Sequence, residues 1–156
     1  MKLLMVCLGN ICRSPLAEGI MKAKIQQHGL DWEVDSAGTG AYHIGQLPDA
    51  RSIAIAQQHG IDLTDQRARQ IKSADLEHFD LILTMDNSNF RNVQALVRNA
   101  QQGKKVKAIL DFAPNHPLRE VPDPYWDDDG FQIVYDLLVE ATEGIGPGQM
   151  TPLNAG

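Results

Sequence analysis

Several features that would set this chain apart from ordinary globular domains are absent from its sequence. It has only two cysteines among 156 residues, too few for a disulfide-stabilised scaffold. No apolar run approaches the roughly 20 residues that a membrane-spanning helix needs. The apolar start, Met1–Cys7, lacks the basic region and the cleavage site of a signal peptide. These absences predict a cytoplasmic protein without a membrane partner.

Positive charge is scarce. The 14 lysines and arginines are outnumbered by 20 aspartates and glutamates, which gives a net charge of −6. Such a chain is a poor general binder of nucleic acid, so none is expected as a partner. An anionic ligand would have to be attracted locally, against this overall field. The apolar fraction of 43% is enough to bury one core.

No internal repeat or linker divides the chain, and short apolar runs alternate with helical periodicity. This alternation predicts an α/β fold, a single doubly wound domain with a four-stranded parallel sheet flanked by helices on both faces. Strands are expected over residues 2–6, 32–36, 80–85 and 106–110, and helices over residues 15–28, 49–59, 90–103 and 131–141. Ser14 is expected to cap the first helix. The domain is expected to cover residues 1–144, followed by a flexible tail at 145–156.

The residues that carry chemistry gather between the first strand and the first helix, where parallel α/β sheets bind their ligands. Backbone N–H groups at a helix start are unpaired, and the helix dipole adds positive potential. Gly9 lets the backbone curve without a Cβ clash, and Arg13 offers a fork of donors that matches phosphate oxygens. A phosphate-binding site is therefore predicted over residues Leu8, Gly9, Asn10, Ile11, Cys12, Arg13 and Ser14.

Cys7 lies in the same local field, where a thiol loses its proton more easily than a free cysteine does. A thiolate inside a phosphate-binding loop is a nucleophile suited to attack on phosphorus, which would form a cysteinyl-phosphate intermediate. Ser14 is a candidate to hydrogen-bond the sulfur and help it leave. A buried cysteine that only packs is the alternative, and Gly9, Arg13 and the helix start weigh against it. A metal site is not expected, because two thiols without a nearby histidine fall short of four ligands.

Three separated motifs resemble those of the low-molecular-weight protein tyrosine phosphatase family. They are VCLGNICRSP at residues 6–15, DSAGT at residues 35–39 and DPYW at residues 123–126, in the family's order. The resemblance covers about residues 2–144. It implies hydrolysis of phosphotyrosine on protein substrates, with Cys7 as nucleophile, Arg13 as phosphate ligand, and no metal or organic cofactor.

Asp123 is the candidate general acid, because the phenolate of a tyrosine ester leaves poorly unless it is protonated. The residues alone leave a Pro-Asp-Pro turn equally open, and the resemblance assigns Asp123 the acid role. The same resemblance places Tyr42, Tyr125 and Trp126 at the rim of the site, as walls for the substrate ring. Packing is the alternative for these aromatic residues. An exposed Tyr125 and Trp126 could also seed association, so a monomer or weak self-association is expected.

Further residues resemble the family's support for the loop. Asn10, which has Ser36 as its expected neighbour in this support, is predicted to adopt a left-handed conformation. Asp86 matches a family position that orients the arginine of the loop or nearby loops. It is also a candidate to cap the following helix, with Asn87 and Ser88 as rivals, and the two roles are compatible. Cys12 either packs beneath the loop or acts as a redox partner that forms a disulfide with oxidised Cys7. The resemblance favours the redox role.

Three other functions remain as alternatives. A thiol-dependent arsenate reductase has a similar fold and loop, but it relays oxidation through further cysteines that this chain lacks. Protein arginine phosphatases are close relatives that tend to carry threonine at the position of Ile11, whose apolar side chain suits an aromatic ester. A phosphotyrosine-binding module without catalysis would keep Arg13 but has no use for Cys7 and Asp123 together. Phosphotyrosine hydrolysis is therefore the predicted function.

Overall fold

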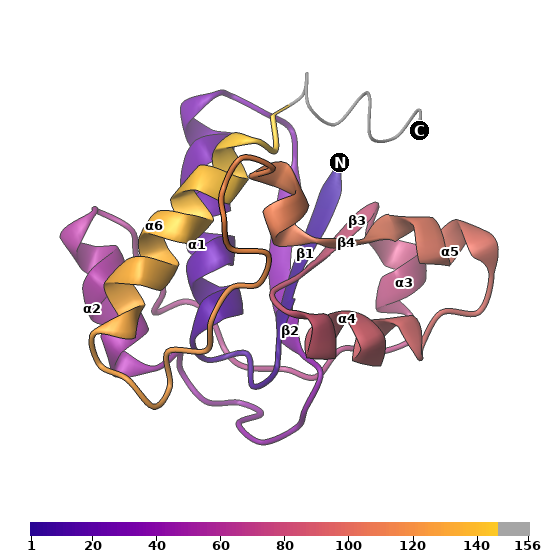
Figure 1. The fold of residues 1–156 in the computed structure, drawn as a ribbon, viewed down its shortest axis with the longest axis horizontal. Coiled ribbons are helices and arrows are strands. Elements are labelled where there is room, and N and C mark those ends of the chain that lie inside the picture. Colours follow the sequence, from indigo (N-terminus) through magenta and orange to yellow (C-terminus); the bar gives the residue numbers. More distant parts are fainter. Residues whose placement is uncertain (147–156) are drawn as a thin grey trace.

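Four parallel strands form the centre of the fold in residues 1–146, the part of the chain that the computed structural model describes (Figure 1). They are β1 (Lys2–Cys7), β2 (Glu33–Gly38), β3 (Leu81–Thr84) and β4 (Val106–Ala108), in the spatial order β2-β1-β3-β4. Each neighbouring pair is parallel. The predicted four-stranded parallel sheet is thus confirmed, and the carboxyl ends of its strands lie along one edge.

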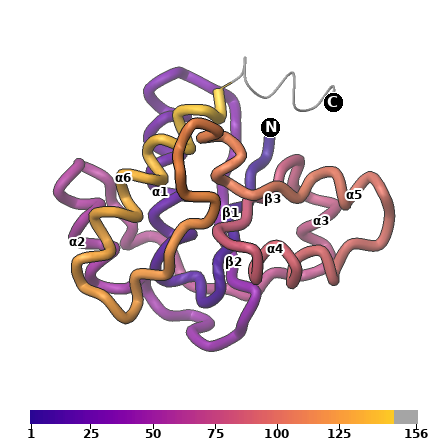
Figure 2. Tube along the Cα trace, in the orientation of Figure 1, coloured from indigo at the N-terminus to yellow at the C-terminus, as the bar shows by residue number. Residues whose placement is uncertain are grey.

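Seven helical segments cover this sheet within the described residues. They are α1 (Arg13–Gln27), α2 (Ala50–Gln58), α3 (Asp75–His78), α4 (Asn87–Gln94), α5 (Ala100–Lys105), the 3₁₀ turn η1 (Ile109–Phe112) and α6 (Gly130–Glu143). Helices α1, α2 and α6 pack together on one face, and α3, α4 and α5 lie on the other (Figures 1 and 2). Helices on both faces complete the doubly wound arrangement that the sequence predicts.

The central strand β1 supplies side chains to both faces. Its residues from Leu3 to Val6 are 0% exposed, as expected of a continuous apolar run inside a parallel sheet. Successive side chains of a strand point to opposite faces. Leu3 and Met5 therefore join the apolar cluster of α1 and α6, whereas Leu4 and Val6 join the cluster that contains Val93 of α4.

The first helix begins two residues earlier than predicted. Helix α1 starts at Arg13, and Cys12 occupies the N-cap position without a side-chain capping hydrogen bond. The hydroxyl of Ser14 lies 3.0 Å from Cys7 Sγ and accepts a hydrogen bond of 2.8 Å from Asn10 Nδ2. The prediction of Ser14 as the cap is wrong, because its hydroxyl belongs to a buried polar cluster inside the loop.

The single helix predicted over residues 90–103 is two helices, α4 and α5. The chain leaves the helical conformation before Asn99, whose backbone is extended (φ −155°, ψ 170°). The Asn99 side chain accepts a hydrogen bond from the Gln102 N–H (2.8 Å), which makes it the N-cap of a new helix. The strand predicted over residues 106–110 ends at Ala108, because the chain turns there into η1.

Other predicted segments agree with the structure or lie beyond it. The helix expected over residues 49–59 is confirmed as α2, with Asp49 as its N-cap. Within residues 1–146, none of the helices has the length and apolar character needed to cross a membrane. Of the tail predicted at residues 145–156, residues 147–156 lie outside the described part of the chain.

Gly144, which follows α6, packs closely against η1. A Cβ atom at this position would overlap the backbone carbonyl oxygen of Phe112, which cannot rotate away as a side chain could. Gly144→Ala is therefore expected to lower the free energy of unfolding by about 1–3 kcal/mol, as measured by urea denaturation. Gly146→Ala is the control, because no described atom lies within 4 Å of its Cβ position. Equal stability of the two variants would contradict the close packing.

Candidate active site

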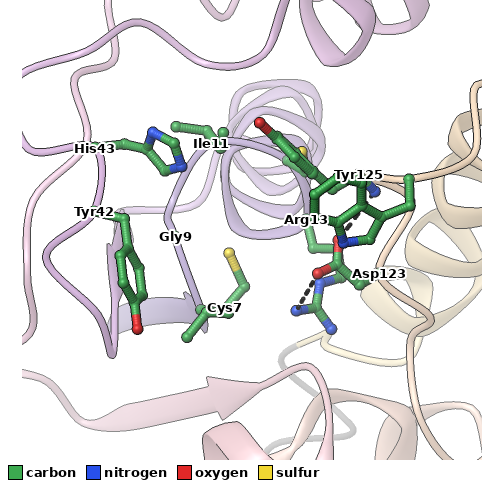
Figure 3. Close-up of a pocket in the computed structure, with 11 residues that line it drawn as sticks. Cys7, Gly9, Ile11, Arg13, Tyr42, His43, Asp123 and Tyr125 are labelled. Atoms are coloured by element: carbon green, nitrogen blue, oxygen red, sulfur yellow. Dashed lines mark hydrogen bonds and ion pairs between the residues drawn. The ribbon is translucent and has the colours of Figure 1, made fainter.

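A pocket of about 350 Å³ opens at the carboxyl end of β1 (Figure 3). It is lined by Cys7, Leu8, Gly9, Ile11, Cys12, Arg13, Tyr42, His43, Asp123, Tyr125 and Trp126. Tyr42 lies on one side of the Cys7 sulfur, and Asp123 and Tyr125 lie on the other (Figure 3). Residues from three distant segments of the chain therefore meet around one sulfur atom.

The β1–α1 loop (residues 8–12) is held by the chain that continues from β2. The Gly40 N–H donates to the carbonyl oxygen of Leu8 (2.9 Å). A Cβ at Gly38 would lie 2.7 Å from that same carbonyl oxygen. The glycine of the DSAGT motif is therefore required by a close approach of two backbones, which fixes the start of the loop.

The side chain of Asn10 holds the β1–α1 loop in place by hydrogen bonds. Its backbone is left-handed (φ 57°), as predicted. Its Nδ2 donates to Ser14 Oγ (2.8 Å) and Ser36 Oγ (3.0 Å), and its Oδ1 accepts from the Arg69 N–H (3.0 Å). Ser14 Oγ in turn lies 3.0 Å from Cys7 Sγ. A buried chain of hydrogen bonds therefore runs from β2 to the cysteine sulfur.

Glu18 lies at the far end of this chain and was not predicted from the sequence. It is 3% exposed, and its carboxylate accepts from Ser36 Oγ (2.7 Å) and pairs with Lys22 Nζ (2.5 Å). Burial raises the pKa of Glu18, and the hydrogen bonds from Lys22 and Ser36 oppose that rise. The i, i+4 spacing of Glu18 and Lys22 was an available signal, because a buried carboxylate needs a charged or hydrogen-bonding partner.

Arg13 is the buried cation of the pocket, with 3% of its surface exposed. Its Nη1 donates to Asp86 Oδ2 (2.7 Å) and to the Val121 carbonyl oxygen (3.0 Å), and its Nη2 lies 3.9 Å from Asp123 Oδ2. Burial lowers the pKa of Arg13, but the charge of Cys7 and the hydrogen bond to Asp86 more than offset this, so that the pKa is raised. The guanidinium therefore faces the pocket as a fixed positive charge.

Both interactions predicted for Asp86 are present. One carboxylate oxygen accepts the hydrogen bond from Arg13, and the other accepts from the Asn89 N–H (2.8 Å) as the N-cap of α4. Because Asp86 stands between β3 and α4, its carboxylate connects the start of that helix directly to the pocket arginine.

Asp123 belongs to a turn and faces the pocket at the same time. It lies in the segment of residues 121–129, which we call the Asp123 loop. Its Oδ1 accepts from the Tyr125 N–H (3.1 Å), as in an Asx turn, while its Oδ2 points at Arg13. Its side chain is 41% exposed. The two alternatives for Asp123, a turn residue or a group facing the site, therefore describe one conformation.

The predicted rim aromatics surround the pocket but differ in exposure. Tyr42 is 72% exposed and Trp126 is 87% exposed. Tyr125 is half-buried and packs edge-on against Trp126, with ring centroids 4.8 Å apart. His43 also lines the pocket and was not predicted. Its place next to Tyr42 in the chain was the one available signal.

Cys12 lies in the pocket wall and is 5% exposed. Burial raises the pKa of the Cys12 thiol to about 12, and the negative charges of Asp49 and Cys7 add to the rise. Cys7 and Cys12 are both free thiols. Within residues 1–146, no group of three or more histidine, cysteine, aspartate or glutamate side chains is arranged to hold a metal ion.

A doubly wound sheet with a cysteine and a buried arginine at the loop after its first strand, faced by a carboxylate, is typical of phosphatases that use a cysteine. Comparison with known proteins identifies the family. The family model described as low molecular weight phosphotyrosine protein phosphatase matches residues 2–147. A relative from Synechocystis sp., named as a low molecular weight protein-tyrosine-phosphatase, is 49% identical over 144 residues, which cover 90% of this chain and 91% of the relative. The chain belongs to the low molecular weight phosphotyrosine protein phosphatase family.

Solved structures are similar over almost the whole chain. A product-state mimic of the protein tyrosine phosphatase from Entamoeba histolytica is 40% identical, with a TM-score of 0.88 and coverage of 100% of this chain and 97% of that chain. The Drosophila arginine phosphatase is 33% identical, also with a TM-score of 0.88, and the match covers 93% of this chain and 95% of that chain.

Two substitutions of Asn10 separate its backbone from its side chain. Asn10→Gly and Asn10→Ala both remove the hydrogen bonds to Ser14 and Ser36, but only glycine adopts the left-handed backbone without strain. Asn10→Ala is therefore expected to be less stable than Asn10→Gly by about 1 kcal/mol in urea denaturation. Both variants are expected to bind orthophosphate more weakly than the wild type in calorimetric titration. Equal stability of the two would show that the loop does not impose this backbone conformation.

Proposed function

We propose that this protein hydrolyses phosphotyrosine monoesters on protein substrates through a cysteinyl-phosphate intermediate. The observation that carries the proposal is the meeting of Cys7 Sγ, the buried Arg13 guanidinium and the Asp123 carboxylate in one pocket. A sulfur nucleophile, a fixed cation and a proton donor are the three groups that phosphate-ester cleavage through a cysteine requires.

In the first step, the phosphoryl group lies in the β1–α1 loop, where the loop amides and Arg13 bind its oxygens. Cys7 Sγ attacks phosphorus as the thiolate, so that an S–P bond forms and the P–O bond to the tyrosine ring breaks. Asp123 gives its proton to the leaving phenolate oxygen. The separation of 3.9 Å between Asp123 Oδ2 and Arg13 Nη2 supports this scheme, because both groups then flank the same phosphoryl group.

In the second step, a water molecule attacks phosphorus while the ionised Asp123 takes its proton. The S–P bond breaks, its electron pair returns to the Cys7 sulfur, and orthophosphate leaves. Ser14 Oγ, which lies 3.0 Å from Cys7 Sγ, stabilises the departing thiolate by donating its hydroxyl proton in a hydrogen bond. The scheme uses only side chains, backbone amides and water.

The walls of the pocket support an aromatic ester as the substrate. Ile11 contributes an apolar side chain to the pocket, and Tyr42 and Trp126 expose their rings at its edge. Tyr42 and Tyr125 lie on opposite sides of Cys7 (Figure 3). An aromatic ring entering between them gains contact area and favourable ring–ring geometry. A phosphoserine side chain has no ring to make these contacts.

Phosphoarginine is the second candidate substrate, favoured by the similarity to the Drosophila arginine phosphatase. The same nucleophile would then attack a phosphorus bound to nitrogen. The apolar side chain of Ile11 favours phosphotyrosine, because a guanidinium loses more hydration than a phenyl ring when it lies against an apolar surface. Arsenate reduction is the least supported alternative, since the chain has only two cysteines to relay oxidation.

We also propose that the protein acts in the cytoplasm as a monomer or with weak self-association. Two free thiols fit a reducing compartment. The exposed ring of Trp126 offers an apolar surface for a transient contact between copies.

Release of phosphate from matched peptides tests the proposed activity. With phosphotyrosine, phosphoserine or phosphoarginine in one sequence context, kcat/KM is expected to be at least about 100-fold higher for phosphotyrosine. Cys7→Ser is expected to abolish turnover, and Asp123→Asn to lower kcat/KM for phosphotyrosine by about 10²–10⁴-fold. A preference for phosphoarginine would overturn the substrate assignment and keep the mechanism. No release from any of the folded wild-type samples would refute both.

We further propose that Cys12 protects Cys7 from irreversible oxidation. Peroxide oxidises the Cys7 thiolate to a sulfenic acid. The Cys12 thiolate then attacks that sulfur, an S–S bond forms, the S–O bond breaks, and the hydroxide that leaves takes a proton from solvent. Because the pKa of Cys12 is about 12, its thiolate fraction grows about tenfold per pH unit near neutrality. Disulfide formation after a peroxide pulse is therefore expected to accelerate with rising pH, as followed by mass spectrometry. Recovery of Cys12→Ser by a thiol reductant to the wild-type level would refute this role.

A further inference from the structure

Arg51, in the first turn of α2, has no part in the mechanism above and yet makes an unusual number of directed contacts. Its Nε and Nη2 donate to the two carboxylate oxygens of Asp49, both at 2.9 Å. Its Nη1 donates to Asp128 Oδ1 (2.5 Å), and its Nη2 donates to the carbonyl oxygen of Tyr125 (3.0 Å). Two of these partners, Tyr125 and Asp128, belong to the Asp123 loop.

The same guanidinium also lies over two aromatic rings. Arg51 Cζ lies 5.7 Å from the ring centroid of Tyr125 and 4.6 Å from that of Phe131, the second residue of α6. Distances of this size are those of cation–π contacts. Arg51 therefore contacts the Asp123 loop directly at Tyr125 and Asp128, and it also contacts Phe131 of α6, the helix that follows this loop.

The first turn of α2 also holds the β1–α1 loop. The Asp49 N–H donates to the carbonyl oxygen of Ile11 (2.8 Å), and Ser52 Oγ donates to that of Cys12 (3.2 Å). One helical turn thus contacts the loop that surrounds Cys7 on one side and the loop that carries Asp123 on the other. The distance between the two loops is set by this shared support.

Hydrogen bonds within the Asp123 loop also hold the carboxylate of Asp123. Tyr125, whose carbonyl oxygen Arg51 binds, donates its own N–H to Asp123 Oδ1 (3.1 Å). On the other side, Arg13 Nη1 binds the carbonyl oxygen of Val121 (3.0 Å). Asp123 therefore lies between two arginine-bound carbonyl groups, with proline on both sides to restrict its backbone.

We propose that Arg51 is a positioning residue that holds Asp123 over the β1–α1 loop and thereby determines how well the leaving group is protonated. The inference rests on the proposed function of Asp123 as general acid. Lysine at this position would keep the charge opposite Asp128. It would lose the several N–H donors with which the guanidinium binds Asp49 and Tyr125 at the same time. It would also lose the planar group that lies over the rings of Tyr125 and Phe131.

If Arg51 only stabilised the fold, its substitution would change the rates for the two substrates in a different way. The ion pair of Arg51 with Asp128 is expected to contribute little to the free energy of unfolding, because exposed ion pairs contribute little and Asp128 is 84% exposed. A substitution of Arg51 that only loosened the packing of the domain would lower the rate for every substrate alike. A displaced general acid lowers the rate most where the leaving group most needs a proton, since good leaving groups depart without one.

The test compares two aryl phosphates in wild type, Arg51→Gln and Arg51→Lys. One is phosphotyrosine peptide, whose phenol has a pKa of about 10, and the other is 4-nitrophenyl phosphate, whose phenol is far more acidic. For Arg51→Gln, kcat/KM is expected to fall about 10–100-fold with phosphotyrosine, less than the roughly 10²–10⁴-fold expected when the general acid is removed, because Asp123 is displaced and not lost. With 4-nitrophenyl phosphate it is expected to fall less than about threefold. Arg51→Lys is expected to lie between wild type and Arg51→Gln.

Three controls separate positioning from other effects. Inhibition by orthophosphate is expected to stay within about twofold of the wild type, because the β1–α1 loop keeps its other supports. Arg91→Gln, which removes an exposed arginine of α4, is expected to leave both substrates unchanged. In an Asp123→Asn background, Arg51→Gln is expected to add no further loss that depends on the leaving group.

The possible outcomes distinguish a failure of the positioning role of Arg51 from a failure of the proposed function. An equal loss with both substrates, or no loss with either, would refute the positioning role while wild-type activity upholds the proposed function. Wild-type protein without phosphatase activity, or an Asp123→Asn variant as active as the wild type, would refute the proposed function itself. If circular dichroism shows that Arg51→Gln does not fold, Asp128→Asn carries the test, because it removes one exposed partner of Arg51. A smaller loss with the same dependence on the leaving group is then expected, and its absence would refute the proposal.

Discussion

The arrangement of the active-site edge follows from one buried cation, the guanidinium of Arg13. A charge removed from water is strongly unfavourable unless it is paired and hydrogen-bonded. The partners that satisfy Arg13 come from far along the chain: the Asp86 carboxylate after β3 and the Val121 carbonyl at the start of the Asp123 loop. Because these partners must reach one guanidinium, the end of β3 and the Asp123 loop are brought to the carboxyl end of β1, and Asp123 comes with them.

A second buried polar system shapes the β1–α1 loop itself. Asn10 joins Ser14 to Ser36, and Ser36 passes the connection to Glu18, whose carboxylate pairs with Lys22 at the protein surface. Each of these groups has a partner, so the buried network specifies one loop conformation. The left-handed backbone of Asn10 persists because the surrounding hydrogen bonds hold it there. A preorganised loop binds an anion without first having to rearrange.

Local patterns predicted those parts of the fold that depend on neighbouring residues in the chain. The apolar run of β1 and the helix over residues 49–59 are examples, and both were correct. The break between α4 and α5 was missed, because the apolar spacing continues through residues 90–100 while the cap at Asn99 starts a new helix. Ser14 was misread as a cap for a related reason: its hydroxyl had a better partner in Cys7 and Asn10 than in the backbone of its own helix.

The sequence by itself determined the contiguous loop of the site, since a cysteine, a glycine and an arginine between a strand and a helix are adjacent in the chain and need no distant partner to be recognised. With the family resemblance it also identified Asp123 and Asp86. Only the tertiary structure revealed Arg51, His43 and Glu18, because the local signals at His43 and Glu18 do not say which distant groups these side chains contact, and Arg51 has no such signal. Their significance lies in contacts such as that of Arg51 with Tyr125, across 74 positions of the chain. Such pairs are selected by the packing of the whole domain, which brings together side chains that no periodicity relates.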